Sequence, residues 1–456
     1  MKPGARHGVV YALLLLLGVG GFVAIRAVGV GFESGATPAQ TAAVVGARGD
    51  VLFHLLLALV TIMITARALG AVFRYLRQPA VIGEVIAGVV LGPTLLGRVA
   101  PEAAHYLLPA QIGPHLGAFA QLGVILYMFV IGVELDFGAL RRDGRTTVLV
   151  AHTSIVVPFL LGSALALPLY ARLAPAGVGF TVFALFLGVA MAVTAFPVLA
   201  RILADHGLQR STLGVIALSC AAVDDVTAWC LLALLVAISQ ADLGAAVQTA
   251  ALTVAFIAGT VVIVRPLLER YLAARDDGGL TRPVLATILV GALGSALATE
   301  AIGIHALFGG FLFGLMVPAG SKIARAIAGP LQDLTVVLFL PAYFAFTGLR
   351  TEIALVSTAT DWLICGAIIL VATAGKLGSS TIAARALGMR WRDAAALGAL
   401  LNTRGLMQLI VLNIGLDLGV LSPTLFAMMV VMALVTTLMT SPLLTALQPP
   451  ATSPVE

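Results

Sequence analysis

Hydrophobic residues occur along this chain in runs of roughly 20, and the short connections between the runs hold most of the charged residues. A run of that length crosses ~30 Å of hydrocarbon as an α-helix. We therefore expect an all-α polytopic membrane protein built from about fourteen such helices. Their predicted ranges are 8–28, 51–73, 79–97, 115–137, 146–171, 179–203, 212–238, 243–268, 282–300, 304–320, 331–349, 361–386, 393–418 and 421–447.

Three segments follow from this pattern. Residues 1–50 hold the first hydrophobic helix, which is either an extra anchor or a signal sequence, and a linker rich in Gly, Ala and Thr. Residues 51–447 form the transmembrane domain, and residues 448–456 form a short tail. Because the first run lacks a convincing small-residue cleavage site, we expect it to be retained.

Composition excludes a soluble chain. Only 10% of the residues are charged, against about 25% in a globular protein, and 60% are hydrophobic. The net charge of +5 does not indicate a nucleic-acid partner, because the basic residues lie in short connections and not on one face or tail.

The basic residues also predict the orientation in the membrane. Counted from residue 51, the connections after odd-numbered helices hold sixteen Lys and Arg residues, whereas the opposite side holds five. Cytoplasmic loops carry the excess of basic residues, so the odd-numbered connections and the C-terminus are expected in the cytoplasm. The five on the opposite side are Arg26, Arg48, Arg98, Arg172 and Arg350.

The two halves of the chain resemble each other. The segment 82–88 is echoed by 302–310, and 129–135 is echoed by 344–350. Helix 243–268 crosses once between two sets of six helices, so the sets must run in opposite directions. About thirteen core helices in two inverted six-helix repeats are typical of secondary transporters. The alternative is chance similarity among helices rich in Gly, Ala and Leu.

Four ionisable residues lie well inside predicted helices, where each costs ~2.5–3.5 kcal/mol on insertion scales and therefore suggests function. They are Asp224, Asp225, Lys376 and Arg404. Asp224 and Asp225 stand ~100° apart on one helix and face different neighbours. One carboxylate can stay ionised beside a cation while the other exchanges a proton or binds a metal cation. The alternative is a helix cap or a buried structural pair.

Lys376 lies between Gly375 and Gly378, which allow another helix to approach closely. We expect this lysine to pair with an aspartate or to carry a proton itself. The alternative is that its side chain extends to the cytoplasmic surface.

Two of the predicted helices contain residues that interrupt helices, at matching depths in the two repeats. Unwound helices free carbonyl groups for cations, and the half-helix ends add dipole charge. Arg404 would neutralise such carbonyl ends or an acidic partner. The alternative at Pro197 is a plain kink. The interrupting residues are Ala195, Phe196, Pro197, Asn402, Thr403, Arg404 and Gly405.

Taken together, these motifs resemble the monovalent cation:proton antiporter superfamily, in the branch of the Kef-type transporters and plant-type cation/proton exchangers. The resemblance spans roughly residues 51–447. It is carried by Gln78-Pro79 through Gly92-Pro93, Thr194 through Arg201, Val223 through Trp229, Leu340 through Leu349, Gly375-Lys376 and Asn402 through Gly405.

The resemblance implies a homodimer with a dimerisation bundle, and a six-helix core in which the two broken helices cross near the aspartates. Asp225 would bind the transported monovalent cation or protons alternately. Asp224 would pair with Lys376, and Thr194 would help to line the site. Members of the family with two adjacent acids and the lysine are often electrogenic.

The chain departs from the family pattern in two places. Relatives often carry a glutamate where Gln408 stands, so no role of that carboxylate transfers to this chain. Kef-type relatives add a nucleotide-binding domain after the helices, whereas about ten residues follow Leu447 here. Such regulation would need a separate regulatory subunit.

The expected function is secondary active antiport of Na⁺ or K⁺ against protons by alternating access, in the cell (inner) membrane. A gated, channel-like K⁺ efflux pathway and a non-transporting membrane sensor are the alternatives. We expect no cofactor and no enzymatic activity, because the sequence offers no nucleophile or metal-ligand constellation.

Overall fold

A computed structural model describes residues 51–134, 144–208, 211–239, 243–275, 279–318 and 320–447. Every regular element within these ranges is helical, as the apolar runs predict. The predicted N-terminal helix with its linker (1–50) and the tail (448–456) lie outside the described residues.

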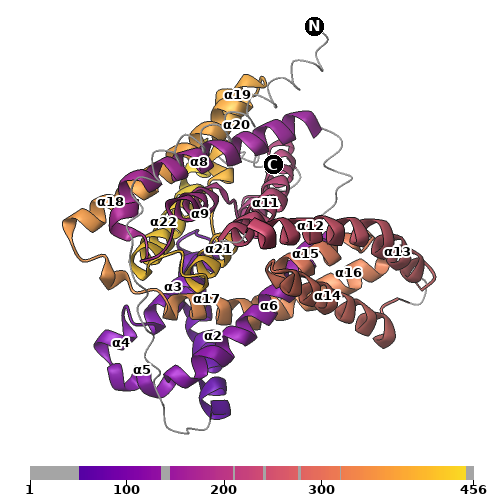
Figure 1. The fold of residues 1–456 in the computed structure, drawn as a ribbon, viewed down its shortest axis with the longest axis horizontal. Helices are drawn as coiled ribbons and strands as arrows, with labels where there is room; N and C mark the ends of the chain where they lie inside the picture. The colour runs from indigo at the N-terminus through magenta and orange to yellow at the C-terminus, as the bar shows by residue number, and fades with distance from the viewer. Residues whose placement is uncertain are drawn as a thin grey trace, which may run out of the picture.

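Within the described residues, ten elements precede the linking helix (Figure 1). They are α2 (Val51–Tyr75), α3 (Ala80–Leu91), α4 (Leu96–Val99), α5 (Pro101–Leu107), η2 (Ala110–Ile112), α6 (Gly113–Glu134), α8 (Gly144–Leu173), α9 (Phe180–Ala192), α10 (Phe196–Asp205) and α11 (Thr212–Ser239).

The linking helix and the second repeat follow, and three π-helical segments (η3, η5 and η7) interrupt their longer helices. These elements are α12 (Leu243–Gly259), η3 (Thr260–Val264), α13 (Arg265–Ala273), α14 (Arg282–Ile302), α15 (Ala306–Met316), α16 (Lys322–Leu334), η5 (Thr335–Phe339), α17 (Leu340–Leu349), η6 (Ile353–Leu355), α18 (Ala359–Thr373), η7 (Ala374–Gly378), α19 (Ser379–Ala386), α20 (Trp391–Leu401), α21 (Leu406–Asp417) and α22 (Pro423–Leu447).

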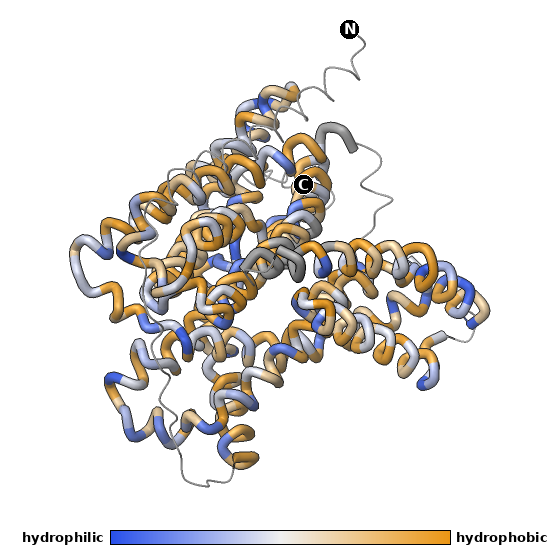
Figure 2. The backbone as a smooth tube through the Cα atoms, viewed as in Figure 1, coloured by the Kyte–Doolittle hydropathy of each residue, from blue (hydrophilic) through white to orange (hydrophobic). Residues whose placement is uncertain are grey.

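Each of the thirteen apolar runs after residue 50 corresponds to a helix or a broken helix, with shifted ends. Ten helices in the described ranges are long and apolar enough to span a membrane, or up to eleven if α20 and α21 form one bent span. Helices α9 and α15 are shorter, so the count of thirteen crossings stays a prediction. Figure 2 shows apolar residues dominating the long helices.

The helices pack in two groups. Helices α2, α3, α6 and α14–α17 contact one another, and we call them the scaffold group. Helices α8–α11 and α18–α22 form the second, crossover group. In Figure 1 the linking helix α12–α13 lies with α14 and α16 at one side of the molecule.

Small residues hold the scaffold together in a reciprocal pattern that matches the repeats. Helix α3 packs on α17, and its repeat mate α15 packs on α6. A Cβ atom on Gly88 of α3 would lie 2.8 Å from Ala345 Cα of α17, and one on Gly314 of α15 would lie 3.0 Å from Gly132 Cα of α6. Only glycine permits such backbone contact, so the echoed glycine motifs mark helix crossings.

Candidate functional site

The first interruption in the crossover group lies between α9 and α10. Residues Val193–Ala195 are extended, and Phe196 and Pro197 are the first two residues of α10. The prediction that Phe196 and Pro197 belong to the interruption is therefore wrong by two residues. Proline is tolerated at a helix start because the first N–H groups have no intrahelical partner there.

The second interruption lies between α20 and α21, at residues 402–405, where the sequence predicts it. It meets the first directly, because Ala195 N donates a hydrogen bond to Thr403 O at 3.0 Å. The Thr194 hydroxyl also lies 3.1 Å from Leu401 O, the last carbonyl of α20. The two broken helices thus cross at their unwound segments.

Two cations cover the C-terminal end of half-helix α9. The Arg404 guanidinium donates to the carbonyls of Ala190 at 3.0 Å, Met191 at 2.7 Å and Val193 at 3.4 Å. Lys376 Nζ donates to the carbonyl of Ala192 at 2.5 Å. These carbonyls lack helical partners and carry the negative end of the helix dipole, so positive charge is stabilising here.

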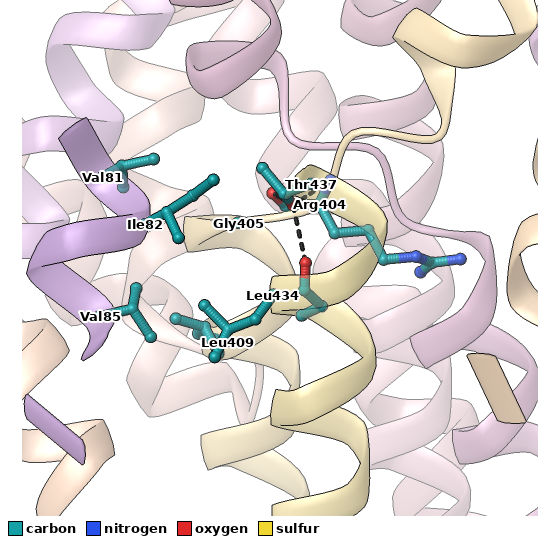
Figure 3. Close-up of a pocket in the computed structure, with 9 residues that line it drawn as sticks. Val81, Ile82, Val85, Arg404, Gly405, Leu409, Leu434 and Thr437 are labelled. Carbon is teal, nitrogen blue, oxygen red and sulfur yellow. Dashed lines mark hydrogen bonds between the residues drawn. The ribbon is translucent and has the colours of Figure 1, made fainter. Parts of the chain in front are cut away.

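The backbone of Arg404 is held from the opposite side. Thr437 of α22 accepts a hydrogen bond from Arg404 N at 3.1 Å and donates one to Arg404 O. Figure 3 shows the Arg404 side chain directed away from Val81, Ile82 and Val85 of α3. Arg404 therefore joins α22 to the end of α9 through the middle of the crossover group.

Asp224 of α11 is fully buried and has donors on every side. Lys376 Nζ lies 2.8 Å from its Oδ2 atom, and the Thr194 hydroxyl lies 2.7 Å from the same atom. The Ser154 hydroxyl of α8 lies 3.0 and 3.2 Å from the two carboxylate oxygens. Such a set of donors stabilises an ionised carboxylate within an apolar interior.

Lys376 occupies a π-helical turn, Ala374–Gly378, between α18 and α19. Its side chain has no exposed surface and so does not extend to the membrane surface. A Cβ atom on Gly375 would already lie 3.0 Å from Leu161 of α8, so this turn lies close against α8. A π-helical turn of this kind frequently marks a functional position in a helix.

Asp225 differs sharply from its neighbour. It is also fully buried, yet neither of its carboxylate oxygens makes a hydrogen bond within the described residues. Burying an unpaired carboxylate is so costly that it must take up a proton or a cation. Asp225 is therefore the group at this crossing with free capacity for either.

A cavity of about 380 Å³ lies between the two groups of helices at the end predicted to be cytoplasmic. Glu84, Tyr127 and Glu134 line it from the scaffold group, and Phe196 and Arg201 line it from α10. Glu84 thus lies in a vestibule between the two groups of helices.

A polar network joins the two groups at the other end. Arg350, just after α17, donates to Asn413 Oδ1 of α21 at 3.0 Å and forms an ion pair with Asp417. Asn413 Nδ2 donates to Thr347 Oγ1 at 2.8 Å and to Tyr343 OH at 3.2 Å. The groups are thus separated by a cavity at one end and connected at the other.

The structure brings together most of the predicted site residues and adds two that the sequence did not single out. Asp224, Lys376, Thr194 and Arg404 meet at the crossing, but the Thr194 hydroxyl contacts Asp224 and makes no bond to Asp225. The Ser154 and Thr437 hydroxyls were missed, because a serine or threonine inside an apolar helix is common and usually bonds only to its own backbone.

Two discontinuous helices that cross beside buried charges, within inverted repeats, define the class of secondary transporters. The chain belongs to the sodium/hydrogen exchanger family, whose transmembrane model matches residues 55–446.

Among its relatives, the Na⁺/H⁺ antiporter NhaS4 of Synechocystis is 40% identical over 88% of this chain and 98% of its own length. Cation/H⁺ antiporter 18 of Arabidopsis thaliana is 39% identical over 87% of this chain but 49% of its own length. K⁺/H⁺ antiporter 1 of Saccharomyces cerevisiae is 35% identical over 84% of this chain and 45% of its own length.

The chain therefore spans about half the length of these plant and yeast relatives. Among solved structures, the sodium proton antiporter MjNhaP1 from Methanocaldococcus jannaschii matches with a TM-score of 0.61 at 14% identity, over 87% of this chain and 97% of that one. This likeness shows a shared fold. It agrees with the all-helical membrane architecture expected from the sequence.

Proposed function

We propose that this chain exchanges Na⁺ or K⁺ for protons by alternating access, and that Asp225 binds the two kinds of ion in turn. The observation that carries the proposal is that the buried Asp225 carboxylate makes no hydrogen bond within the described residues, whereas the adjacent Asp224 carboxylate is fully paired. A metal cation and a proton satisfy the same free carboxylate, and the two therefore compete for it.

The cavity and the polar network support alternating access. In each of two alternating states, the scaffold and crossover groups must be open at one end and closed at the other. Here the cavity opens one end, and hydrogen bonds between the groups close the other. In the opposite state the Arg350–Asn413 contact is broken and the cavity near Glu84 and Arg201 is closed.

The finer properties belong to the same proposal. Relatives named for Na⁺ and for K⁺ support either cation. We propose electrogenic exchange, a homodimer, residues 51–447 as the transport domain, and a cytoplasmic C-terminus in a cell membrane. The sixteen-to-five bias of basic residues supports this orientation.

The test uses purified protein in liposomes that contain a pH-sensitive dye, with Na⁺, K⁺ or Li⁺ added in turn. We expect cation-dependent proton movement in the native protein and none in Asp225→Asn. Glu269→Gln is the control, because Glu269 is an exposed carboxylate paired with Arg265 on α13. Normal exchange by Asp225→Asn would show that another residue binds the ion.

A further inference from the structure

Ser154 lies in the interior of α8 and has no exposed surface. Its hydroxyl oxygen is 3.0 Å from Asp224 Oδ2 and 3.4 Å from Lys376 Nζ. By comparison, the Thr194 hydroxyl hydrogen-bonds to Asp224 and to the backbone of α20, but within the described residues it makes no hydrogen bond with Lys376. Among the residues that the structure describes, Ser154 is thus the uncharged side chain that hydrogen-bonds to both members of the buried ion pair.

The single proton of the Ser154 hydroxyl has a choice of acceptors. One is the Asp224 carboxylate, and the other is the carbonyl of Ala151, one turn back on α8, at 2.8 Å. An ionised acceptor forms the stronger hydrogen bond. The proton therefore points to Asp224 while that carboxylate is charged, and it returns to Ala151 when the carboxylate is neutral.

Lys376 needs the oxygen of the same hydroxyl. An ammonium group has three N–H donors and no acceptor. Asp224 Oδ2 takes one donor, Ala192 O takes the second, and Ser154 Oγ is the third acceptor that the described residues provide. Ser154 can accept from Lys376 and donate to Asp224 at once, so it stabilises both charges of the pair.

We propose that Ser154 is a positioning residue of the exchange site, which holds the Asp224–Lys376 pair in its ionised form and so keeps Asp225 available to the transported ion. The inference rests on the proposed exchange function. Asp225 adjoins Asp224 on α11, so the positive charge of Lys376 also acts on it. If Asp224 loses its charge, the lysine is left without its partner and competes with the transported cation for Asp225.

The other ionisable groups near this pair come from two elements. Cys220 and Asp225 lie on α11 with Asp224, and Arg404 approaches from the second interruption. Arg404 hydrogen-bonds to the carbonyls of Ala190, Met191 and Val193 at the end of α9 and to Gln408. None of these groups forms a salt bridge with Asp224 in the described residues, whereas Lys376 does, and Ser154 contacts that bridge directly.

The experiment compares Ser154→Ala with Ser154→Thr and with Ser163→Ala. Ser163 is a matched control because it is equally buried on α8, but within the described residues its hydroxyl bonds to the carbonyl of Ala184 and to no charged group. Exchange is measured in liposomes from pH 6 to pH 9 against Na⁺ and K⁺, with KM and maximal rate at each pH. The pH inside the liposomes equals the pH outside at the start of each measurement.

In Ser154→Ala we expect the acid limb of the pH profile to move to higher pH by about one unit, which is the effect of one lost hydrogen bond to a charged group. The cation KM rises about tenfold on that limb, whereas the maximal rate at alkaline pH changes little. Ser154→Thr restores the native profile, and Ser163→Ala retains it. A rate lowered by one factor at every pH would mean a merely structural serine and would overturn the inference.

A second measurement does not depend on transport. Thermal unfolding of Ser154→Ala, Lys376→Met and the double variant gives the coupling between the two side chains. Ser154→Ala should lower the unfolding midpoint in the native background, and its effect in Lys376→Met should differ from that by at least half, because one of its two charged partners is gone. Equal effects in both backgrounds would refute the positioning role. If the native protein showed no exchange, the proposed function would fail, and this coupling alone would decide whether Ser154 supports the pair.

Discussion

Replacing Lys376 by Met isolates the energy of the buried ion pair. Lys376 Nζ lies 2.8 Å from Asp224 Oδ2, and neither side chain has exposed surface. Removing one partner of a buried pair leaves an uncompensated charge and costs ~3–5 kcal/mol. Asp224 keeps hydroxyl donors from Ser154 and Thr194, so the loss should fall near the lower end, at about 3 kcal/mol.

The assay is thermal unfolding of purified variants in one detergent at one scan rate. A loss of that size lowers the midpoint by roughly 3–6 °C in a chain of this length. Lys322→Met is the control, because Lys322 is exposed at the start of α16 and a surface change stays within about 0.5 kcal/mol. Asp224→Asn combined with Lys376→Met removes both charges and should recover most of the stability.

Two results would refute this reasoning. If Lys376→Met unfolded at the same temperature as Lys322→Met, the ion pair would contribute nothing to stability. If the double variant were as unstable as Lys376→Met, the cost would come from lost packing or from the lost bond to Ala192 O, and an unpaired Asp224 would not be its cause.

Three further changes test other contacts of the fold. Gly348→Ala should destabilise the protein by about 1–3 kcal/mol, because a Cβ there would overlap the α3 backbone at Gly88. The control Gly366→Ala, on the open face of α18, should be neutral or stabilising. Equal unfolding midpoints of the two variants would contradict the close helix crossing. Arg404→Lys should abolish proton exchange in liposomes and cost at least about 2 kcal/mol, since one ammonium cannot replace the guanidinium at the carbonyls of Ala190, Met191 and Val193. Native exchange rates would disprove this. Asn413→Leu should cost about 1–3 kcal/mol by leaving the Arg350 and Tyr343 groups without their amide partner, and an unchanged thermal midpoint would argue against the network.

Short-range patterns in the amino-acid sequence predicted much of this fold. Apolar runs and the charges between them locate the helices after residue 50, and the Asn402–Gly405 segment marks its interruption to the residue. The first interruption was misplaced, because proline is as compatible with the first turn of a helix as with a break. The number of crossings depends on how short helices such as α9 and α15 sit in the bilayer, which length alone does not decide.

The sequence by itself determined that the chain is a helical membrane protein with buried charges in discontinuous helices. A charge or a helix break inside hydrocarbon costs free energy, so both features mark functional positions in the apolar runs. The residue pattern left open which aspartate is paired and the family resemblance implied Asp224, but only the tertiary structure gives the physical reason. Asp224 and Asp225 are adjacent and chemically identical, and their difference arises from Lys376, Thr194 and Ser154, which reach Asp224 from three other elements. Hydrogen bonds between residues 30 to 152 positions apart depend on how helices pack, and no local pattern in the sequence encodes that geometry.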